Sequence, residues 1–515
     1  MSLYLCYDIR GIQSFIFKIP KLKYIIGGSA LIDKFDRTDV PALVKPIPGA
    51  DYIFSGGGKG AFLCDNKDTV SKLKEKIIEA AHSIGLDIRF GEDEDFSQAS
   101  QHADELYSFV PATGSKPCPV SGLYPVDENG REHDVIRKRM IQRGEKMFNY
   151  FEDKLITEVL HPALSGKNVE FFHNVKPEDE DGMAGCETLG NRNRWAVIAM
   201  DGNDMGSQFR HQVSKNNANR LEGEKLTEWI KKMSLALDEC SAAAAKAGIQ
   251  QVVSEWADTE KGRQFIAERK EVTLPVRPLV VGGDDVIVLC HSSFAMTFVK
   301  EAIRVWEETS AQNPHLWSAT GGKLTISAGV LYCPVTLPLH TAIPYAEALL
   351  ASAKTKGRKL NTAKENVPSP ACIDWEQVTD SVIDTPAAKR QREFFFLDKE
   401  IDRVVKLTSR PYSLEEYDEL EGLARLYGEG RRSKGIKPIP RTVRHRVLPA
   451  LSRCSSERFA FVAEIKKNHR NLYQDLCEYE MNRSRWKEVE GAMVTDVIDA
   501  LLLLEEDERM EKETA

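Results

Sequence analysis

The stretches WAVIAMDGNDMG, at residues 195–206, and VGGDDVIVLC, at residues 281–290, decide the fold of this chain. The first contains a continuous apolar run, which predicts a buried strand that ends at Asp201. In the second, two apolar runs meet at a GGDD turn, which predicts a β-hairpin. We expect the strand and the hairpin to lie side by side, so that the carboxylates of Asp201, Asp284 and Asp285 converge at one end of a sheet.

The segments around these stretches alternate between strand and helix patterns. Apolar residues at helical spacing predict helices at 224–247 and 293–309, and a further apolar run predicts a strand at 324–332. With the strand and the hairpin, the order is strand-helix-strand-strand-helix-strand. That order is the ferredoxin-like arrangement.

The first 95 residues repeat this order of elements. Their predicted strands are 3–7, 52–54, 61–64 and 86–90, and helical patterns begin at Ile12 and cover 70–84. The hairpin SGGGKGAFLC, at 55–64, aligns without a gap with VGGDDVIVLC, and each hairpin follows a strand that ends in an aspartate, Asp8 or Asp201. Two glycine hairpins can look alike by chance. The repeated order together with the shared aspartate favours a duplicated domain.

The sequence therefore predicts an α+β protein with two ferredoxin-like domains of the palm or nucleotide-cyclase type and a helical C-terminal domain. We place the degenerate palm at 1–110, an inter-palm insertion at 111–190, the GGDD palm at 191–385 and the C-terminal domain at 386–515. The insertion has a helix pattern at 135–160 and an acidic loop, PEDEDG, at 177–182. The C-terminal domain reads as helical from about Phe394, with a capping box at Ser413 and Glu416.

Composition excludes several classes of protein. The 515 residues, 42% hydrophobic and 29% charged, are those of a globular protein with several domains. We see neither a signal peptide nor the roughly 18 apolar residues of a membrane span. The ten cysteines are scattered singly, so we expect a reducing, cytoplasmic location without a disulfide framework. A net charge of −8 argues against a generally basic nucleic-acid coat.

The acids of the second repeat suit divalent cations. Mg²⁺ or Mn²⁺ accepts carboxylate oxygens and takes other ligands from substrate phosphates, and two such ions activate a hydroxyl and neutralise pyrophosphate. We predict Asp201, Asp284 and Asp285 as the catalytic and metal-binding residues. The glycines Gly202, Gly282 and Gly283 would let phosphates approach the backbone. The alternative is a solvent-exposed, aspartate-rich β-turn.

A basic cluster follows the last strand of the second repeat. YAEALLASAKTKGRKLN, at 345–361, reads as a helix with Lys354, Lys356 and Arg358 near its end. These cations suit triphosphate oxygens. The alternative is a helix C-terminus decorated with cations that complement its dipole.

These motifs resemble a known family. DGNDMG, VGGDDVIVL, TISAGV and YAEALLASAKTKGR resemble the palm of nucleotide and diguanylate cyclases. YDIRGIQSFIF and LKYIIGGSALI are similar to the N-terminal part of the polymerase-like large subunit of type III CRISPR effector complexes. The likeness covers about residues 1–65 and 190–365 by motif.

The resemblance implies an enzyme that makes cyclic oligoadenylates from ATP in antiviral defence. It implies that the first palm binds an acceptor nucleotide near Ser55, Gly57 and Lys59. In that palm Gly58 and Lys59 replace the hairpin acids, so we expect it to be catalytically silent. The implied partners are nucleoside triphosphates, RNA and the other subunits of an RNA-guided complex.

The sequence also departs from the family. We find no pattern for the HD nuclease that many relatives carry, no CxxC partner for Cys118 in a zinc site, and Asn203 where relatives often have an acid. A stand-alone mono- or dinucleotide cyclase, a homodimer, and a non-catalytic nucleotide-binding scaffold or sensor remain alternatives. The stretch 431–446, with seven basic residues and no acid, reads either as a patch for RNA or a partner, or as an ordinary solvated loop.

Overall fold

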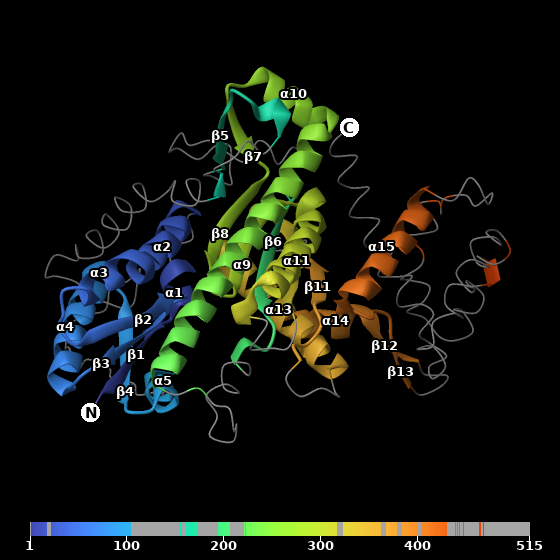
Figure 1. Ribbon diagram of the computed structural model, residues 1–515. Helices are drawn as coiled ribbons and strands as arrows, with labels where there is room; N and C mark the ends of the chain where they lie inside the picture. The colour runs from blue at the N-terminus through green and yellow to red at the C-terminus, as the bar shows by residue number, and fades with distance from the viewer. Residues whose placement is uncertain are drawn as a thin grey trace, which may run out of the picture.

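The computed structural model describes most of both repeats and parts of the C-terminal region (Figure 1). The described residues are 2–17, 22–104, 155–156, 161–172, 194–206, 221, 223–316, 323–361, 367–378, 384–398, 403–429 and the isolated positions 438, 440, 442, 446, 463, 464 and 467. Nearly all of the helix expected at 135–160 lies outside them. The PEDEDG loop, Cys118 and most of the basic stretch 431–446 lie outside them as well.

The first repeat is a four-stranded antiparallel sheet with the strand order β2-β3-β1-β4. Its strands are β1 (Leu3–Arg10), β2 (Ala50–Gly56), β3 (Lys59–Cys64) and β4 (Asp87–Asp93). Its helices are α1 (Ile12–Phe17), α2 (Leu22–Lys34), the π-helical η1 (Phe35–Asp39), α3 (Val40–Val44), α4 (Lys67–Ile84) and α5 (Phe96–Asp104). The four strands and α4 lie where the sequence predicted them, whereas the helical pattern from Ile12 covers several short helices.

Helix α4 illustrates why these residues fold as they do. The Asn66 side chain accepts a hydrogen bond from the Thr69 amide, 3.0 Å away, and caps the start of the helix. Gly85, with φ of 82°, ends the helix in the left-handed conformation that glycine adopts most easily. Between these caps, Leu73 and Ile77 are fully buried against the sheet.

The second repeat has the same topology inside a larger sheet. Its four ferredoxin strands are β6 (Arg194–Gly202), β8 (Val276–Gly282), β9 (Asp285–His291) and β10 (Ile326–Pro334), and its helices are α9 (Gly223–Asp258), α11 (Ala295–Gln312) and α13 (Leu339–Leu360). The order β10-β6-β9-β8 matches β4-β1-β3-β2 of the first repeat. On the β10 side, β11 (Cys372–Gln377) and β14 (Tyr412–Ser413) extend the sheet.

Helix α9 is longer than the sequence predicted and reaches Asp258. Its last turns stay helical because Val252, Val253 and Ala257 are fully buried in the core. No helix in the described ranges is both long enough and apolar enough for a bilayer crossing.

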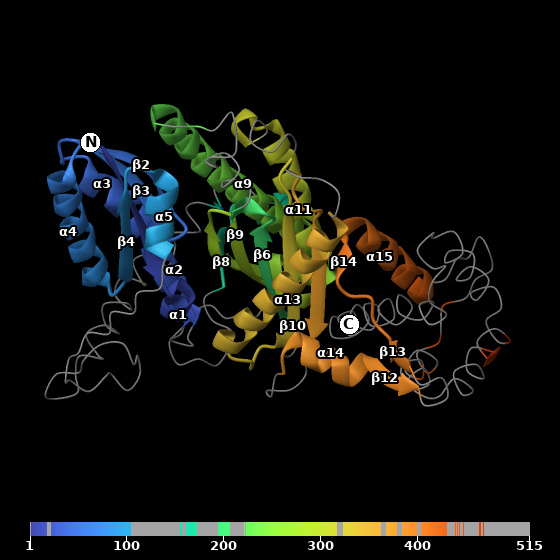
Figure 2. The same ribbon diagram turned by 90° about the horizontal axis from the view of Figure 1, so that it is seen from below.

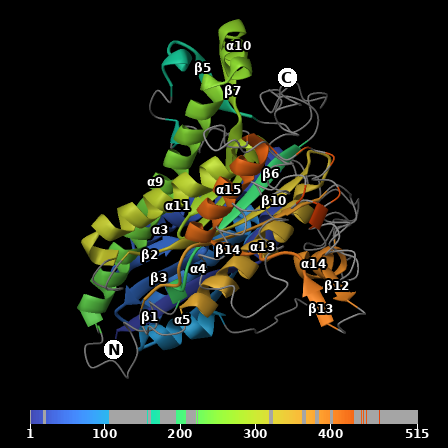
Figure 3. The same cartoon turned by 90° about the vertical axis from the view of Figure 1, so that its right-hand side faces the viewer.

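A small substructure projects from one end of the second palm. It contains the 3₁₀ turn η2 (Pro162–Leu164), β5 (Asn168–Phe171), α10 (Glu260–Glu268) and β7 (Glu271–Leu274). Outside this substructure, a further 3₁₀ turn, η4 (Ser292–Phe294), precedes α11. β5 pairs with β7 in parallel, and Figure 3 shows both strands and α10 extending together.

The two palms pack together through equivalent elements. Helix α9 of the second palm packs on β2 of the first, and α2 of the first packs on β8 of the second. Leu226 and Ile230, near the start of α9, are buried with Tyr4 and Ile53 of the first sheet. Figures 1 and 2 show α9 running along the boundary between the palms. Each palm therefore contributes its first crossover helix to the edge strand of the other.

The expectation of helices from about Phe394 onward is wrong for the first part of that region. After α14 (Pro386–Phe394), the strands β12 (Phe395–Asp398) and β13 (Arg403–Lys406) pair with each other, and β14 pairs with β11 of the palm sheet. Aromatic and β-branched residues in these runs favour strands. The helix α15 (Leu414–Glu429) follows. Its predicted capping box is confirmed: Ser413 N donates to Glu416 Oε2 at 2.9 Å, and Glu416 N donates to Ser413 Oγ at 3.3 Å.

Candidate metal and nucleotide site

Three carboxylates meet where β6 ends and β9 begins. Asp201 lies opposite Asp285 in the antiparallel register, and Gly202 N donates to the Asp284 carbonyl at 3.3 Å. One carboxylate oxygen from each of Asp201, Asp284 and Asp285 lies within 4.8 Å of the others. The structure thus brings together the three acids that the sequence placed on separate segments.

The cluster is electrostatically unfavourable by itself. Partial burial, followed by the charge of Asp201, raises the pKa of Asp284 to about 7. The pKa of Asp285 is raised by the same two causes and by Asp284, although its side chain reaches the surface. Three negative charges at this separation repel one another, so a cation placed among them would stabilise the ionised forms.

Lys354 is the basic residue that reaches the cluster. From α13, its ammonium donates to the Asp201 carboxylate and, at 2.8 Å, to the Gly202 carbonyl. Only 14% of its side chain is exposed. The structure therefore places Lys354 beside the acids, where it forms an ion pair with Asp201.

The other two predicted cations of α13 point to different partners. Lys356 is two residues from Lys354, on the opposite side of the helix, and its Nζ lies 3.6 Å from Glu416 Oε2 of α15. Arg358 is one turn beyond Lys354, and its Nε lies 3.5 Å from Asp204 Oδ1. Lys356 thus joins the palm to α15 instead of facing the carboxylates. Arg358 stays at the edge of the site, with 62% of its side chain exposed.

The loop after β6 is held by side chains that the sequence left unassigned. Asn203 is buried, and its Nδ2 donates to Thr325 Oγ1 at 2.9 Å. Asp204, with φ of 56°, accepts hydrogen bonds from Ser369 N at 2.9 Å and Ser369 Oγ at 2.5 Å. Neither residue belongs to the carboxylate cluster. Both fix the loop that directly follows the strand carrying Asp201.

The glycines of the site have distinct structural roles. A Cβ on Gly202 would lie 2.9 Å from Met205 Cγ and 3.1 Å from Asp284 Cβ, so only glycine permits this close approach. Gly283 has a φ of 61°, which glycine adopts without strain. Its amide donates to Asp238 Oδ1 at 2.9 Å, and its carbonyl accepts a hydrogen bond from Ser241. The amide and the carbonyl of Gly283 are therefore both bound by side chains of α9.

Asp238 and Ser241, which hold this turn, were not predicted from the sequence. They lie three residues apart on α9, about forty residues before the hairpin, so helical periodicity placed them on one face without indicating what that face contacts. Arg37 of the first palm also reaches Asp238 Oδ1, at 2.7 Å. No local motif signals this contact.

In the first palm an ion pair takes the place of the acid pair. Asp8 lies opposite Lys59 in the register, as Asp201 lies opposite Asp285. Lys59 Nζ lies 2.8 Å from Asp104 Oδ1 and 3.7 Å from Asp8 Oδ1. Burial lowers the pKa of Lys59, but Asp104 and Asp8 outweigh that effect and leave it above its usual value.

The rest of the glycine hairpin in the first palm is also held from within. Asp36 of η1 accepts hydrogen bonds from Gly58 N at 2.7 Å and Tyr7 Oη at 2.6 Å. Ser55 is buried, and its hydroxyl donates to the Asp36 carbonyl. Gly57, with φ of 62°, has open space around it. Of the predicted acceptor-binding residues, Ser55 and Lys59 are therefore engaged in contacts inside the palm.

The second-palm cluster fits Mg²⁺ or Mn²⁺. Each of its three side chains offers a carboxylate oxygen, the donor that these hard cations prefer. Within the described ranges, no other group of three acidic, histidine or cysteine side chains comes together in this way. Asp201, Asp284 and Asp285 are the residues that would hold the ions.

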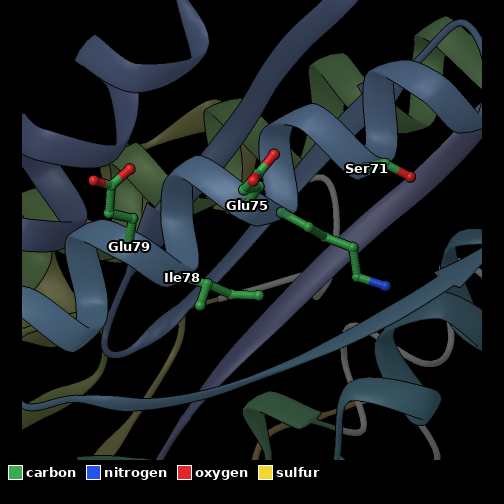
Figure 4. Close-up of a pocket in the computed structure, with 5 residues that line it drawn as sticks. Ser71, Glu75, Ile78 and Glu79 are labelled. Atoms are coloured by element: carbon green, nitrogen blue, oxygen red, sulfur yellow. The ribbon is translucent and has the colours of Figure 1, made fainter.

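A separate hollow lies on the surface of α4 (Figure 4). It is lined by Ser71, Lys74, Glu75, Ile78 and Glu79. All of these residues come from one helix of the first palm, and none belongs to the carboxylate cluster. The hollow is open to solvent and is not part of the candidate site.

Comparison with known proteins agrees with this geometry. Residues 194–363 match the model of the Cas10/Cmr2 second palm domain. The second repeat is similar to the Cas10/Cmr2 second palm domain. The resemblance to the polymerase-like large subunit of type III CRISPR effector complexes is thus confirmed, as is the α+β fold. Among curated proteins, none matches the sequence significantly.

Solved structures extend the likeness of this Cas10-like chain to nearly its whole length. A Csm1–Csm4 cassette in complex with cA4 aligns with 98% of this chain and 70% of its own, at a TM-score of 0.53 and 14% identity. A Csm1–Csm4 subcomplex of the type III-A CRISPR-Csm interference complex gives 0.51 and 15%, with 98% and 70% covered. Csm1 of T. onnurineus gives 0.50 and 16%, with 99% and 69% covered. At these identities the likeness establishes the fold.

Proposed function

We propose that the second palm condenses nucleoside triphosphates, ATP first among them, into a cyclic or linear oligonucleotide and releases pyrophosphate. The observation that carries the proposal is the convergence of Asp201, Asp284 and Asp285 within 4.8 Å at the end of the palm sheet. The Cas10/Cmr2 match over residues 194–363 and the cA4 bound to the similar Csm1–Csm4 cassette support it. In antiviral defence, such a product would act as a second messenger.

The chemistry needs an acceptor hydroxyl and a triphosphate in line. The 3′-hydroxyl of one nucleotide loses its proton to solvent and its oxygen attacks the α-phosphorus of the next nucleotide. A new P–O bond forms, and the bond between the α-phosphorus and the bridging oxygen of pyrophosphate breaks. When bound, two Mg²⁺ or Mn²⁺ ions would lower the pKa of the hydroxyl and neutralise the leaving pyrophosphate. Asp201, Asp284 and Asp285 would hold the ions. Lys354, with its ammonium at the edge of the cluster, would balance negative charge on the transferring phosphate.

We also propose that the chain works as a subunit of an RNA-guided effector complex. Two of the similar structures are of Csm1 together with Csm4, one of them as part of a CRISPR-Csm interference complex. A Csm4-like subunit is therefore the first partner to test. Product formation that rises only when partner and RNA are added would support this assembly, whereas equal activity of the isolated chain would favour a stand-alone cyclase.

The enzyme assay uses the full chain with each nucleoside triphosphate and Mg²⁺ or Mn²⁺, with and without RNA. We expect pyrophosphate release and a new oligonucleotide mass with ATP. The double variant Asp284→Ala/Asp285→Ala should lose both. As a matched control, Asp51→Ala/Asp87→Ala removes two exposed aspartates of the first palm and should keep both. Full activity of the double GGDD variant would refute the proposal, and triphosphate binding without product would identify a non-catalytic sensor.

A further inference from the structure

A chain of polar contacts runs from the first palm to the GGDD turn of the second. Arg37 lies on η1, and its Nε donates to Asp33 Oδ1 at 2.6 Å. Its Nη2 crosses to α9 and donates to Asp238 Oδ1 at 2.7 Å. The same Asp238 oxygen accepts the amide of Gly283 at 2.9 Å. One guanidinium and one carboxylate thus connect the first palm to the turn that contains Asp284.

These side chains lie in a partly buried interface between the two palms. The exposed fractions of the side chains are 25% for Arg37, 12% for Asp33 and 14% for Asp238. Burial lowers the pKa of Arg37, but Asp33 and Asp238 outweigh it and leave the pKa above its usual value. A guanidinium donates from several fixed directions, so Arg37 can bind both carboxylates without leaving its rotamer.

The GGDD turn needs support from outside itself. Gly282 and Gly283 have no side chains, and glycine has the greatest backbone freedom of all residues. The contacts that restrain Gly283 are those to Asp238 and Ser241 of α9. Asp284 and Asp285 follow immediately, so these restraints, together with the pairing of Asp285 with Asp201 and the hydrogen bond from Gly202 N to the Asp284 carbonyl, fix both carboxylates relative to Asp201.

The first palm contains a comparable device. There Asp36 accepts the amide of Gly58, at the turn position equivalent to Asp284, and both residues belong to the same palm. In the second palm Asp238 accepts the amide of Gly283, one position earlier in the turn, and its charge is balanced by Arg37 of the first palm. The turn that carries the hairpin acids is therefore the one whose supporting carboxylate also binds a residue of the other palm.

We infer that Arg37 and Asp238 are positioning residues that set the geometry of the metal-binding turn according to how the two palms are docked. This inference rests on the proposed function, because it concerns the same three carboxylates. The first palm then has a role in the reaction apart from holding a nucleotide. When it is seated against α9 and β8, Arg37 orients Asp238, and Asp238 orders the turn. When it moves away, the turn loses that support.

The test measures Mn²⁺ affinity by electron paramagnetic resonance without nucleotide, and then kcat and KM for ATP. Removal of a group that orients a metal ligand typically weakens metal binding by about 10- to 100-fold. We expect a loss in that range for Asp238→Ala and a smaller loss for Arg37→Ala, with kcat lowered more than KM is raised. Asp238→Asn keeps an oxygen that can accept the Gly283 amide, so it should recover part of the affinity.

The control is Arg304→Ala. Arg304 also binds two carboxylates, those of Glu301 and Glu308, but on the exposed face of α11. Melting temperatures establish that the variants are folded, and if Asp238→Ala does not fold, Asp238→Asn and Arg37→Lys replace it as milder changes. Wild-type Mn²⁺ affinity and kcat in the Arg37 and Asp238 variants would overturn the inference. Absence of Mn²⁺ binding and of product in the wild type would instead overturn the proposed function.

Discussion

Lys59 of the first palm and Asp285 of the second occupy the same position, each opposite the aspartate at the end of the central strand. Asp8 faces Lys59 in one palm, and Asp201 faces Asp285 in the other. In the second palm, two like charges lie side by side and favour a cation between them. In the first, the lysine ammonium already supplies the positive charge, which explains in physical terms why only one palm is suited to metal.

Replacing that lysine should turn an ion pair into a cation site. Lys59→Asp places a third carboxylate beside Asp8 and Asp104. The test uses the Asp284→Ala/Asp285→Ala background. Without metal, we expect the Lys59→Asp variant to have a lower melting temperature than its parent. When Mg²⁺ or Mn²⁺ is added, the melting temperature of the variant should rise. The rise should be about 3 °C for each kcal/mol of binding free energy. Lys59→Ala, which adds no ligand, is the control, and a variant with no metal dependence would contradict the explanation.

Gly58 shows why the first palm does not easily regain its other acid. A Cβ at this position would lie 2.0 Å from Ile12 Cδ1, and the φ of 81° is unfavourable for other residues. We expect Gly58→Asp to lower the midpoint of urea unfolding. The double variant Gly58→Asp/Ile12→Ala should recover part of that loss. Unchanged stability of the single variant would show that the hairpin relaxes freely.

Lys354 should affect turnover without weakening metal binding. Lys354→Ala removes the ammonium that contacts the Asp201 carboxylate, and we expect product formation to fall on the order of 10²-fold. Mn²⁺ affinity should stay the same or rise, because a competing cation is lost. Lys359→Ala changes an exposed lysine of the same helix and should have no effect. Parallel loss of Mn²⁺ binding and turnover would mean that Lys354 only maintains the local fold.

Asp36 predicts a pH dependence of stability. Complete burial raises its pKa to about 7, against the usual value of 3.8, while Tyr7 and Gly58 oppose the shift. The folded protein therefore holds this proton more tightly than the unfolded chain does. The resulting stabilisation is complete below pH 3.8 and disappears as the pH rises through 7, by about 1.4 kcal/mol per pH unit in between.

The measurement is urea unfolding from pH 5 to 8, compared with Asp36→Asn. The variant keeps a side chain of similar size and cannot titrate. Its free energy of unfolding should therefore fall less steeply with pH than that of the wild type, and the difference in slope should correspond to one proton. Identical slopes for the two proteins would show that Asp36 is ionised throughout.

A buried ion network should hold the end of the second palm together. Arg390 of α14 donates to both oxygens of Asp374, at 2.6 and 2.9 Å, and to Glu376 at 3.1 Å, and all three side chains are buried. Removing one partner of such a group leaves uncompensated charge and costs about 3–5 kcal/mol. Arg390→Ala should therefore lower the melting temperature markedly. Arg392→Ala, an exposed arginine of the same helix, should leave it unchanged.

The sequence was sufficient for the elements that follow local rules. Apolar runs and glycine turns gave the strands of both palms, and helical spacing gave α4, α11 and most of α13. The capping box at Ser413 was correct because its partners are three residues apart. The prediction of helices after Phe394 was wrong, because the pairing of β12 with β13 and of β14 with β11 depends on neighbouring strands that short-range patterns do not reveal.

The candidate site divides along the same line. The sequence alone determined which acids are present and that the GGDD hairpin has a degenerate copy. Both follow from the order of the apolar runs and from the residues at the hairpin turns, which can be read directly from the sequence. Only the tertiary structure decided what surrounds them. In the folded protein Lys356 lies beside Glu416, and Lys59 lies opposite Asp8. Arg37 binds Asp238, which is 201 residues away in the sequence. Such contacts depend on how two sheets and their crossover helices pack, and no residue spacing along the sequence encodes that.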